Sequence, residues 1–308
     1  MNWKLKAAIQ NIIAQLPEVI GNQLYFQVQY HFGNLRRIRP IGTALAGLQT
    51  CEHIISCGHE VKGATFFEVG TGRMLTIPII YWLAGADRTF TVDLHHYLRP
   101  NLVKEAIKKL VTSREELFSK HSTIIDKGRW KKLCELDGTI ELSEILKVCH
   151  IDYSAPTDAT NVDVDNHTID FHTSHTVLEH IPPKDLLDIL KEEKRVLKTN
   201  GLFVHHVDYS DHFSHSDNSI NPLNFLKYND TEWQRLAGNR FMYMNRLRHV
   251  DYLRLLKITN LSVIKEVPVI NQEMVNFVNE NKSLFDEQFS CYSDQDLAPI
   301  GGWLIAKP

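Results

Sequence analysis

The chain has 308 residues, of which 43% are hydrophobic and 23% charged, a composition typical of a globular protein with a full core. The net charge of −3 provides no basic field, so no nucleic acid is expected as the main partner. No stretch approaches the roughly 20 apolar residues that a membrane-spanning helix needs, so no membrane span is expected either.

The N-terminal region, residues 1–62, has the spacing of amphipathic helices. Ile9, Ile12, Ile13 and Leu16 fall on one helical face, and polar residues interrupt any signal-like apolar run. Five cysteines without a C-x-x-C pair fit reduced thiols, and a cytoplasmic protein is expected. We expect residues 1–62 to form a helical extension or cap, and residues 63–308 to form the main domain.

Strands and helices alternate from Thr65 onward. The apolar runs that predict strands are TFFEV, RTFTVDL, CHIDYSAP, TIDFHTSHTVL and LFVHHVDY, and amphipathic stretches lie between them. One of these helices is expected to run through PKDLLDILKEEKRVLKTN and to end at Gly201. Such alternation predicts a doubly wound α/β fold with a mostly parallel sheet.

The C-terminal part has a different order. A helix is expected at HVDYLRLLKITN, a strand at LSVIKEVPVI, a helix at NQEMVNFVNENKSLF and a closing strand at GGWLIAKP. A last strand of this kind can insert beside its neighbour and run antiparallel to it. Residues 210–247 lack clear periodicity, and their length favours an insertion or lid.

The turn EVGTGR follows the first strand and contains two glycines that let a ligand approach the backbone. The dinucleotide pattern G-x-G-x-x-G fails here, because Leu75 stands at its third glycine position. Glu68 suits a cationic ligand, and Asp93, at the end of the second strand, is placed to accept hydrogen bonds from ribose hydroxyls. S-adenosylmethionine has this combination of groups.

Over residues 60–308 the sequence resembles class I S-adenosylmethionine-dependent methyltransferases, in EVGTGR, TVDL, APTDATN, SHTVLEHIP and LKTNGLFVHHVDY. Met74 departs from their E/D-x-G-x-G-x-G motif, where a third glycine is usual. The resemblance implies a seven-stranded sheet with an antiparallel last strand. It implies binding of S-adenosylmethionine by Glu68, Gly70, Thr71, Gly72, Asp93, Leu94, Asp158, Ala159, Ser174 and His175, with Asp158 and Ala159 at the adenine.

The stretch HHVDYSDHFSH leaves the fifth strand, where an acceptor would meet the methyl group. A hydroxyl acceptor must lose its proton near the transition state, and histidine titrates in the right range to take it. We expect His206 or His212 to act as the base, with His175 behind them. This predicts a methyltransferase for a small-molecule or sugar-type acceptor, and oxygen as the methylated atom.

Three other interpretations remain open at this point. The fold could serve binding or assembly without catalysis, or the chain could be a nicotinamide-dependent oxidoreductase, against which Glu68 and Leu75 argue. His206, Asp208, His212 and His215 could ligate a divalent cation, but no compact metal motif supports this, and no metal is expected. The identity of the acceptor and the oligomeric state are not indicated by the sequence.

Overall fold

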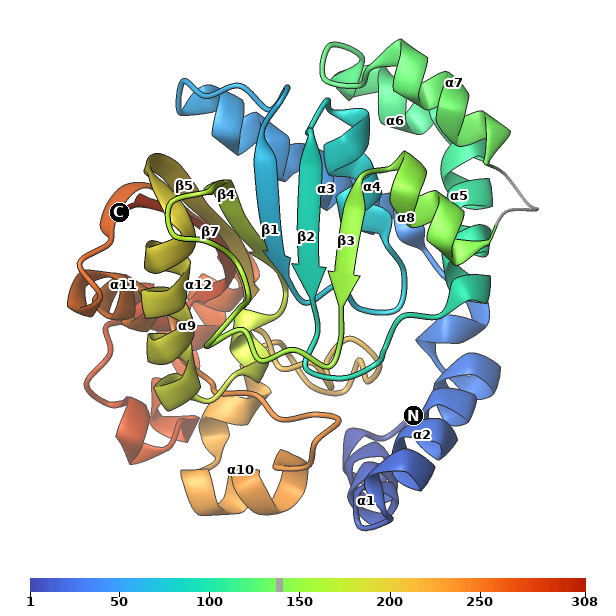
Figure 1. Ribbon diagram of the computed structural model, residues 1–308. Coiled ribbons are helices and arrows are strands. Elements are labelled where there is room, and N and C mark those ends of the chain that lie inside the picture. The colour runs from blue at the N-terminus through green and yellow to red at the C-terminus, as the bar shows by residue number, and fades with distance from the viewer. Residues whose placement is uncertain (137–140) are drawn as a thin grey trace.

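A single seven-stranded sheet organises the computed structural model, which describes residues 1–136 and 141–308 (Figure 1). The strands are β1 (Thr65–Val69), β2 (Arg88–Val92), β3 (Ile151–Ser154), β4 (Ile169–His175), β5 (Leu197–Asp208), β6 (Ser262–Ile270) and β7 (Pro299–Lys307). Their spatial order is β3-β2-β1-β4-β5-β7-β6. The first five strands run parallel, and β7 lies antiparallel between β5 and β6. The predicted fold class is confirmed.

Helices cover both faces of the sheet. Figure 1 shows α9 (Pro183–Val196) in front of the sheet, and α3 (Pro40–Ser56) and α4 (Thr76–Leu83) behind it. Neighbouring residues of a strand point to opposite faces, so Phe66 packs with Tyr81 of α4, whereas Phe67 packs in the cluster that contains Leu190 of α9. Both faces are therefore buried, which is the usual state of a parallel sheet.

The remaining helices surround this core. They are α1 (Trp3–Ala14), α2 (Glu18–Phe32), α5 (Pro100–Thr112), α6 (Arg114–His121), α7 (Lys127–Glu135), α8 (Leu142–Val148), α10 (Asp230–Ala237), α11 (His249–Ile258), α12 (Gln272–Asn281) and α13 (Asp294–Leu297). Short 3₁₀ turns occur at Asn34–Arg37, Leu178–His180, Asn224–Lys227, Lys282–Leu284 and Glu287–Phe289. Within the described ranges, no helix has both the length and the apolar character needed to cross a membrane.

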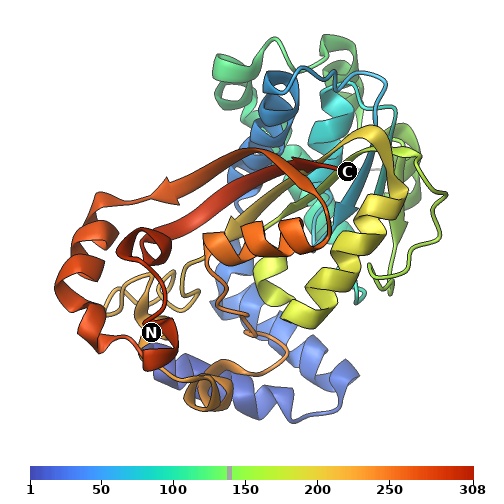
Figure 2. The same cartoon turned by 90° about the vertical axis from the view of Figure 1, so that its left-hand side faces the viewer.

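The N-terminal helices contact distant parts of the chain. Trp3 of α1 packs its ring against Phe213 and Trp233, with ring centroids 5.4 and 6.3 Å apart, and in Figure 2 the N-terminus lies among the gold and red C-terminal segments. Helix α3, unlike α1, packs directly on the sheet domain: its Leu48 and Ile54 are fully buried in the clusters behind the sheet. The division into residues 1–62, residues 63–308 and a lid at 210–247 stays a prediction.

One predicted boundary is wrong. The helix expected to end at Gly201 ends at Val196, and β5 begins at Leu197. Leu197 is fully buried and pairs with Ile169 at the start of β4, and Lys198 forms a 2.8 Å ion pair with Asp170. These contacts with β4 extend the strand backward through residues that have helical spacing in the sequence. The five cysteines, all among the described residues, are free.

Candidate functional site

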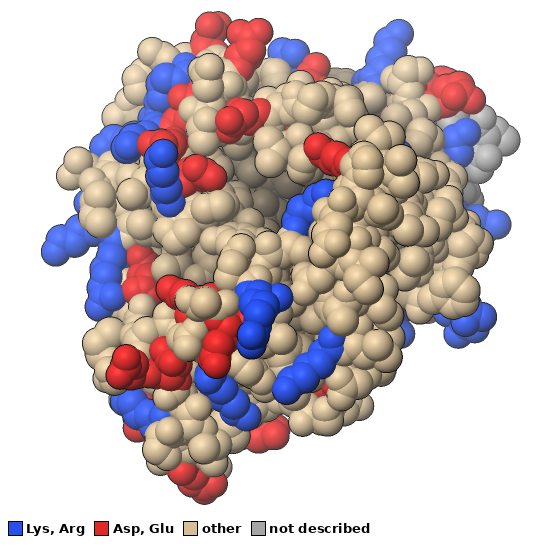
Figure 3. Space-filling view, turned by 90° about the horizontal axis from the view of Figure 1, so that it is seen from below, with Lys and Arg blue, Asp and Glu red and all other residues tan. Residues whose placement is uncertain are grey.

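A cavity of about 920 Å³ opens at the carboxyl ends of the parallel strands. Figure 3 shows this face from below, with a hollow near its centre and with acidic and basic side chains interspersed over the surrounding surface. The turn after β1, the ends of β2 and β4, helix α2 and the segment 240–243 all contribute to the lining. In doubly wound sheets this edge is where ligands bind, because the strand order reverses beside β1.

The turn after β1 has two glycines with positive φ. Gly70 has φ +90° and Gly72 has φ +69°, a region that other residues rarely adopt. A Cβ on Gly70 would overlap Cγ2 of Val177, whereas a Cβ on Gly72 would meet nothing within 4 Å. The backbone N–H of Gly70 donates to Val92 at 2.8 Å, which ties the turn to β2. The turn therefore presents bare backbone to the cavity.

Glu68 is the last acid before this turn and is buried at the cavity wall, with 2% of its surface exposed. The hydroxyl of Thr91 donates to its Oε2 at 2.7 Å, and the hydroxyls of Thr91 and Thr71 are 2.6 Å apart. Burial raises the pKa of Glu68 to about 8, although the bond from Thr91 opposes this and the nearby Asp93 adds to it.

Asp93 follows β2 and lines the same cavity. Its Oδ2 accepts a hydrogen bond from the backbone N–H of Gly72 at 2.8 Å, so the carboxyl group is fixed against the glycine turn. Burial raises its pKa to about 7, against the opposing effects of the Gly72 bond and the Arg73 charge. Two carboxyl groups with raised pKa values thus border one cavity, and a cationic ligand would favour their ionised forms.

The predicted histidines occupy different positions. His175, the last residue of β4, lines the cavity. His206 of β5 pairs with it across the sheet, with the two rings stacked 4.9 Å apart, but His206 contacts Trp303 and is not among the described residues that line the cavity. The pKa of His175 falls to about 4, mainly through burial and secondly through the charge of His206. His175 is therefore neutral near pH 7.

His212 lies in a polar corner beside the cavity. Its Nε2 is 3.3 Å from Oδ2 of Asp208 and 3.9 Å from Oε1 of Glu179, and its ring meets that of His180 at 4.9 Å. His180 lines the cavity, whereas His212 is not among its described lining residues. The pKa of Asp208 falls to about 2, because hydrogen bonds and charge from His212 and Ser210 outweigh its burial.

Four of the predicted cofactor residues are absent from the cavity lining found among the described residues: Leu94, Asp158, Ala159 and Ser174. Leu94 is 62% exposed. Asp158 is exposed and accepts hydrogen bonds from the backbone and hydroxyl of Thr160, at 2.9 and 2.8 Å, which form a local turn. Ser174 is buried, and its hydroxyl is 2.6 Å from Nδ1 of His205. Their proposed cofactor contacts stay predictions.

Several lining residues were not identified from the sequence. Arg73 directly follows the glycine turn, and its guanidinium lies over the rings of Phe26 and Tyr97 at 5.3 Å. Arg99 also lines the cavity. Arg240 lines the cavity as well, but its guanidinium donates to the carbonyls of Ala14 and Leu16. The position of Arg73 next to Gly72 was the one sequence signal that could have identified Arg73 as a lining residue. Its aromatic partners Phe26 and Tyr97 come from α2 and from the loop after β2, and no sequence spacing relates them to the glycine turn.

Residues 131–205 match the family model described as a methyltransferase domain. The matched stretch runs from α7 into β5 and includes Ser174 and His175, but it does not include the glycine turn. No curated protein matches the sequence. The family match and the sheet topology confirm the resemblance to class I methyltransferases.

Solved structures with a similar fold include phosphoethanolamine N-methyltransferase 2 of Haemonchus contortus, in complex with phosphomonomethylethanolamine and S-adenosylhomocysteine. It is 13% identical with a TM-score of 0.50, over 92% of this chain and 56% of that chain. Geranyl diphosphate C-methyltransferase of Streptomyces coelicolor A3(2) is 12% identical with a TM-score of 0.46, over 84% of this chain and 77% of that chain. At these identities the similarity concerns the fold alone.

Proposed function

We propose that this chain, which has the class I methyltransferase topology and a methyltransferase-domain match over residues 131–205, transfers a methyl group from S-adenosylmethionine to a small-molecule acceptor. The observation that carries the proposal is the pair Glu68 and Asp93 bordering one cavity together with the bare backbone of Gly70 and Gly72. S-adenosylmethionine supplies an activated methyl group on a sulfonium, whose departure needs little further assistance from the protein.

The cavity residues fit this molecule group by group. The Asp93 carboxylate, held by the N–H of Gly72, is placed to accept from the ribose hydroxyls. Glu68 provides negative charge for the cationic part, and the Arg73 guanidinium suits a carboxylate. The absence of side chains at Gly70 and Gly72 permits close approach to the backbone. These residues therefore bind and orient the cofactor.

The affinity for S-adenosylmethionine is expected to increase as the pH rises through about 7 and 8. Below their pKa values of about 8 and 7, Glu68 and Asp93 are protonated and must release a proton when the cation binds. The dissociation constant at pH 6 should therefore exceed that at pH 8.5 by about tenfold or more. Calorimetric titrations across this range measure it, and Glu68→Gln should make the profile shallower, leaving the contribution of Asp93. A flat profile in the unmodified protein would contradict this electrostatic role.

The proposed acceptor chemistry is O-methylation of a small molecule or sugar-type compound, with a histidine as general base. Of the three predicted histidines, His175 is the one that lines the cavity, so it is the base that we propose. Its lowered pKa of about 4 keeps the imidazole unprotonated at neutral pH, although it also makes His175 a weaker base than an ordinary histidine. The cavity wall formed by Tyr97, Arg99 and Tyr243 would exclude water and contact the acceptor.

The substitution His175→Asn is expected to lower the methyl-transfer rate by about 10²- to 10⁴-fold, the usual contribution of a general base. The matched control is His206→Asn, on the paired residue outside the cavity lining, and it should have a much smaller effect. Transfer of labelled methyl to a panel of sugars, phenols and quinones provides the assay. Equal losses for both variants, or none for His175→Asn, would remove His175 as the base.

A further inference from the structure

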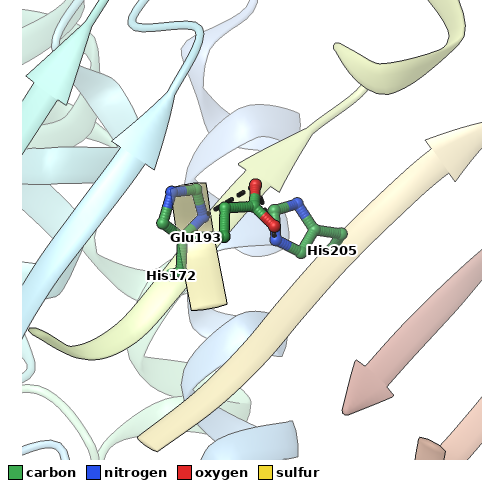
Figure 4. A group of neighbouring side chains, drawn as sticks. All are labelled: His172, Glu193 and His205. Atoms are coloured by element: carbon green, nitrogen blue, oxygen red, sulfur yellow. Dashed lines mark ion pairs between the residues drawn. The ribbon is translucent and has the colours of Figure 1, made fainter. Parts of the chain in front are cut away.

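Three ionisable side chains meet inside the protein between the sheet and helix α9. Figure 4 shows His172 of β4, Glu193 of α9 and His205 of β5 directed toward one another. His172 is 2% exposed, and Glu193 and His205 are fully buried. The group lies on the face of the sheet opposite to the cluster of Trp303 and α3, and it is not part of the cavity lining. The proposed methyltransferase chemistry does not use it.

Four polar atoms of this cluster have no hydrogen-bond partner among the described residues. They are Nδ1 of His172, Nε2 of His205 and both carboxyl oxygens of Glu193. Each buried polar atom left unpaired costs about 1–3 kcal/mol, and an ionised carboxylate costs more. Some additional partner would relieve this cost.

The spacing of the atoms fits a cation better than a shared proton. Oε1 of Glu193 is 3.1 Å from Nδ1 of His172 and 3.8 Å from Nε2 of His205. A proton can join only one such pair at a time, and 3.8 Å is beyond hydrogen-bond reach. Donors that each lie about 2.0–2.1 Å from a tetrahedral zinc ion are separated by about 3.3 Å. The 3.1 Å separation is near this value, the 3.8 Å separation is longer, and all three donor atoms lie within 4.8 Å of one another.

The surroundings of His205 have the form usual for a metal ligand. Its Nδ1 is 2.6 Å from the hydroxyl of Ser174, a contact that leaves Nε2 directed at Glu193. Ligating histidines commonly use their second ring nitrogen for such an orienting hydrogen bond. Two imidazoles and one carboxylate are a donor set used for zinc and other divalent transition metals.

We propose that His172, Glu193 and His205 form a buried binding site for a divalent transition-metal ion such as zinc, to which they supply three donors. The inference is independent of the proposed methyltransferase activity, and it departs from the expectation that no metal is bound. Because the three residues are buried, the ion enters as the chain folds and exchanges slowly afterwards. It joins two central strands to α9 and so stabilises the fold.

The metal content of the purified full-length protein tests this directly. After dialysis against a chelator, elemental analysis should find about one zinc or similar ion per chain, and Glu193→Gln should reduce this at least tenfold. The control Glu52→Gln makes the same change in another histidine–glutamate pair, His121 and Glu52, whose nitrogen and oxygen are 2.9 Å apart. It should leave the metal content unchanged. Loss of metal in the control as well would contradict the assignment.

A second measurement applies if Glu193→Gln does not fold. The unmodified protein is unfolded with a chelator, and refolded with or without Co²⁺. Refolding with Co²⁺ should yield visible absorption bands of a tetrahedral cobalt site and a higher Tm than refolding without metal. Absence of metal from the purified protein, together with no bands and an unchanged Tm, would overturn the proposal. None of these readouts depends on S-adenosylmethionine, so they do not decide the proposed activity.

Discussion

The substitution Asp93→Asn is expected to lower the affinity for S-adenosylmethionine by about 10- to 100-fold. Hydrogen bonds to a charged acceptor contribute about 1.5–3 kcal/mol, and an amide in place of the carboxylate loses both the charge and one acceptor for the ribose hydroxyls. In the unmodified protein the N–H of Gly72 donates to Oδ2 of Asp93 at 2.8 Å. The side-chain oxygen of asparagine can accept the same hydrogen bond, so the turn should keep its shape. Isothermal titration calorimetry measures the change.

The matched control is Asp87→Asn, before the amino end of the same strand and exposed to solvent. It should leave the dissociation constant within about twofold. Asp93→Asn should not lower Tm at pH 8, because burial raises the pKa of Asp93 to about 7 and a neutral side chain avoids the cost of a buried charge. If Asp93→Asn binds S-adenosylmethionine with unchanged affinity, Asp93 does not bind the ribose hydroxyls as proposed.

The substitution Gly70→Ala should both destabilise the protein and remove most cofactor binding. A Cβ at Gly70 would overlap Cγ2 of Val177, and φ of +90° disfavours any side chain. The backbone conformation costs about 1–2 kcal/mol and the overpacking about 1–3 kcal/mol, so ~2–5 kcal/mol of stability should be lost. To relieve this overlap, either Val177 or the Gly70 backbone must shift. Both line the cavity, so the shift would change the surface that contacts the ligand. Thermal unfolding and calorimetric titration measure the two effects.

Gly63→Ala separates these contributions. Gly63 has a similar φ of +77°, but a Cβ there would meet nothing within 4 Å, and the residue lies outside the cavity lining found in the described ranges. This variant should lose only the conformational part of the stability and bind S-adenosylmethionine normally. If Gly70→Ala behaves like Gly63→Ala in both measurements, close approach of the ligand at Gly70 is not required.

The fold could be predicted because its signals are local. Short apolar runs alternating with amphipathic stretches define the order of strands and helices, and parallel strands bring their carboxyl ends to one edge. The same logic placed Glu68, Gly70, Gly72 and Asp93 at one cavity. The start of β5 was missed because Leu197 is held in the sheet by pairing with Ile169, a contact distant in sequence.

The surroundings of the acceptor depend on tertiary packing, which local sequence patterns do not define. Alternation along a strand places neighbours such as His205 and His206 on opposite faces, but it could not show that His206 would pack against Trp303. On the cofactor side, Asp158, expected at the adenine, lies in a loop where its carboxylate accepts hydrogen bonds from Thr160. Tyr25 reaches the cavity from α2, and no sequence spacing links that helix to the strands.

The buried cluster illustrates the same limit. His172 and His205 lie on neighbouring strands, offset along the sheet, and Glu193 is on the helix between those strands. Their separation in the sequence is far from that of compact metal motifs, so only the packing of α9 on the sheet brings the donors together.

A crystal structure of the chain with S-adenosylhomocysteine bound would show whether the cavity at the glycine turn holds the cofactor. We expect the nucleoside in the cavity at the carboxyl ends of the strands, with its ribose hydroxyls on the Asp93 carboxylate and its amino-acid part between the Gly70–Gly72 backbone and His175. Electron density for the ligand elsewhere on the protein, or no binding in the cavity at millimolar concentration, would contradict it.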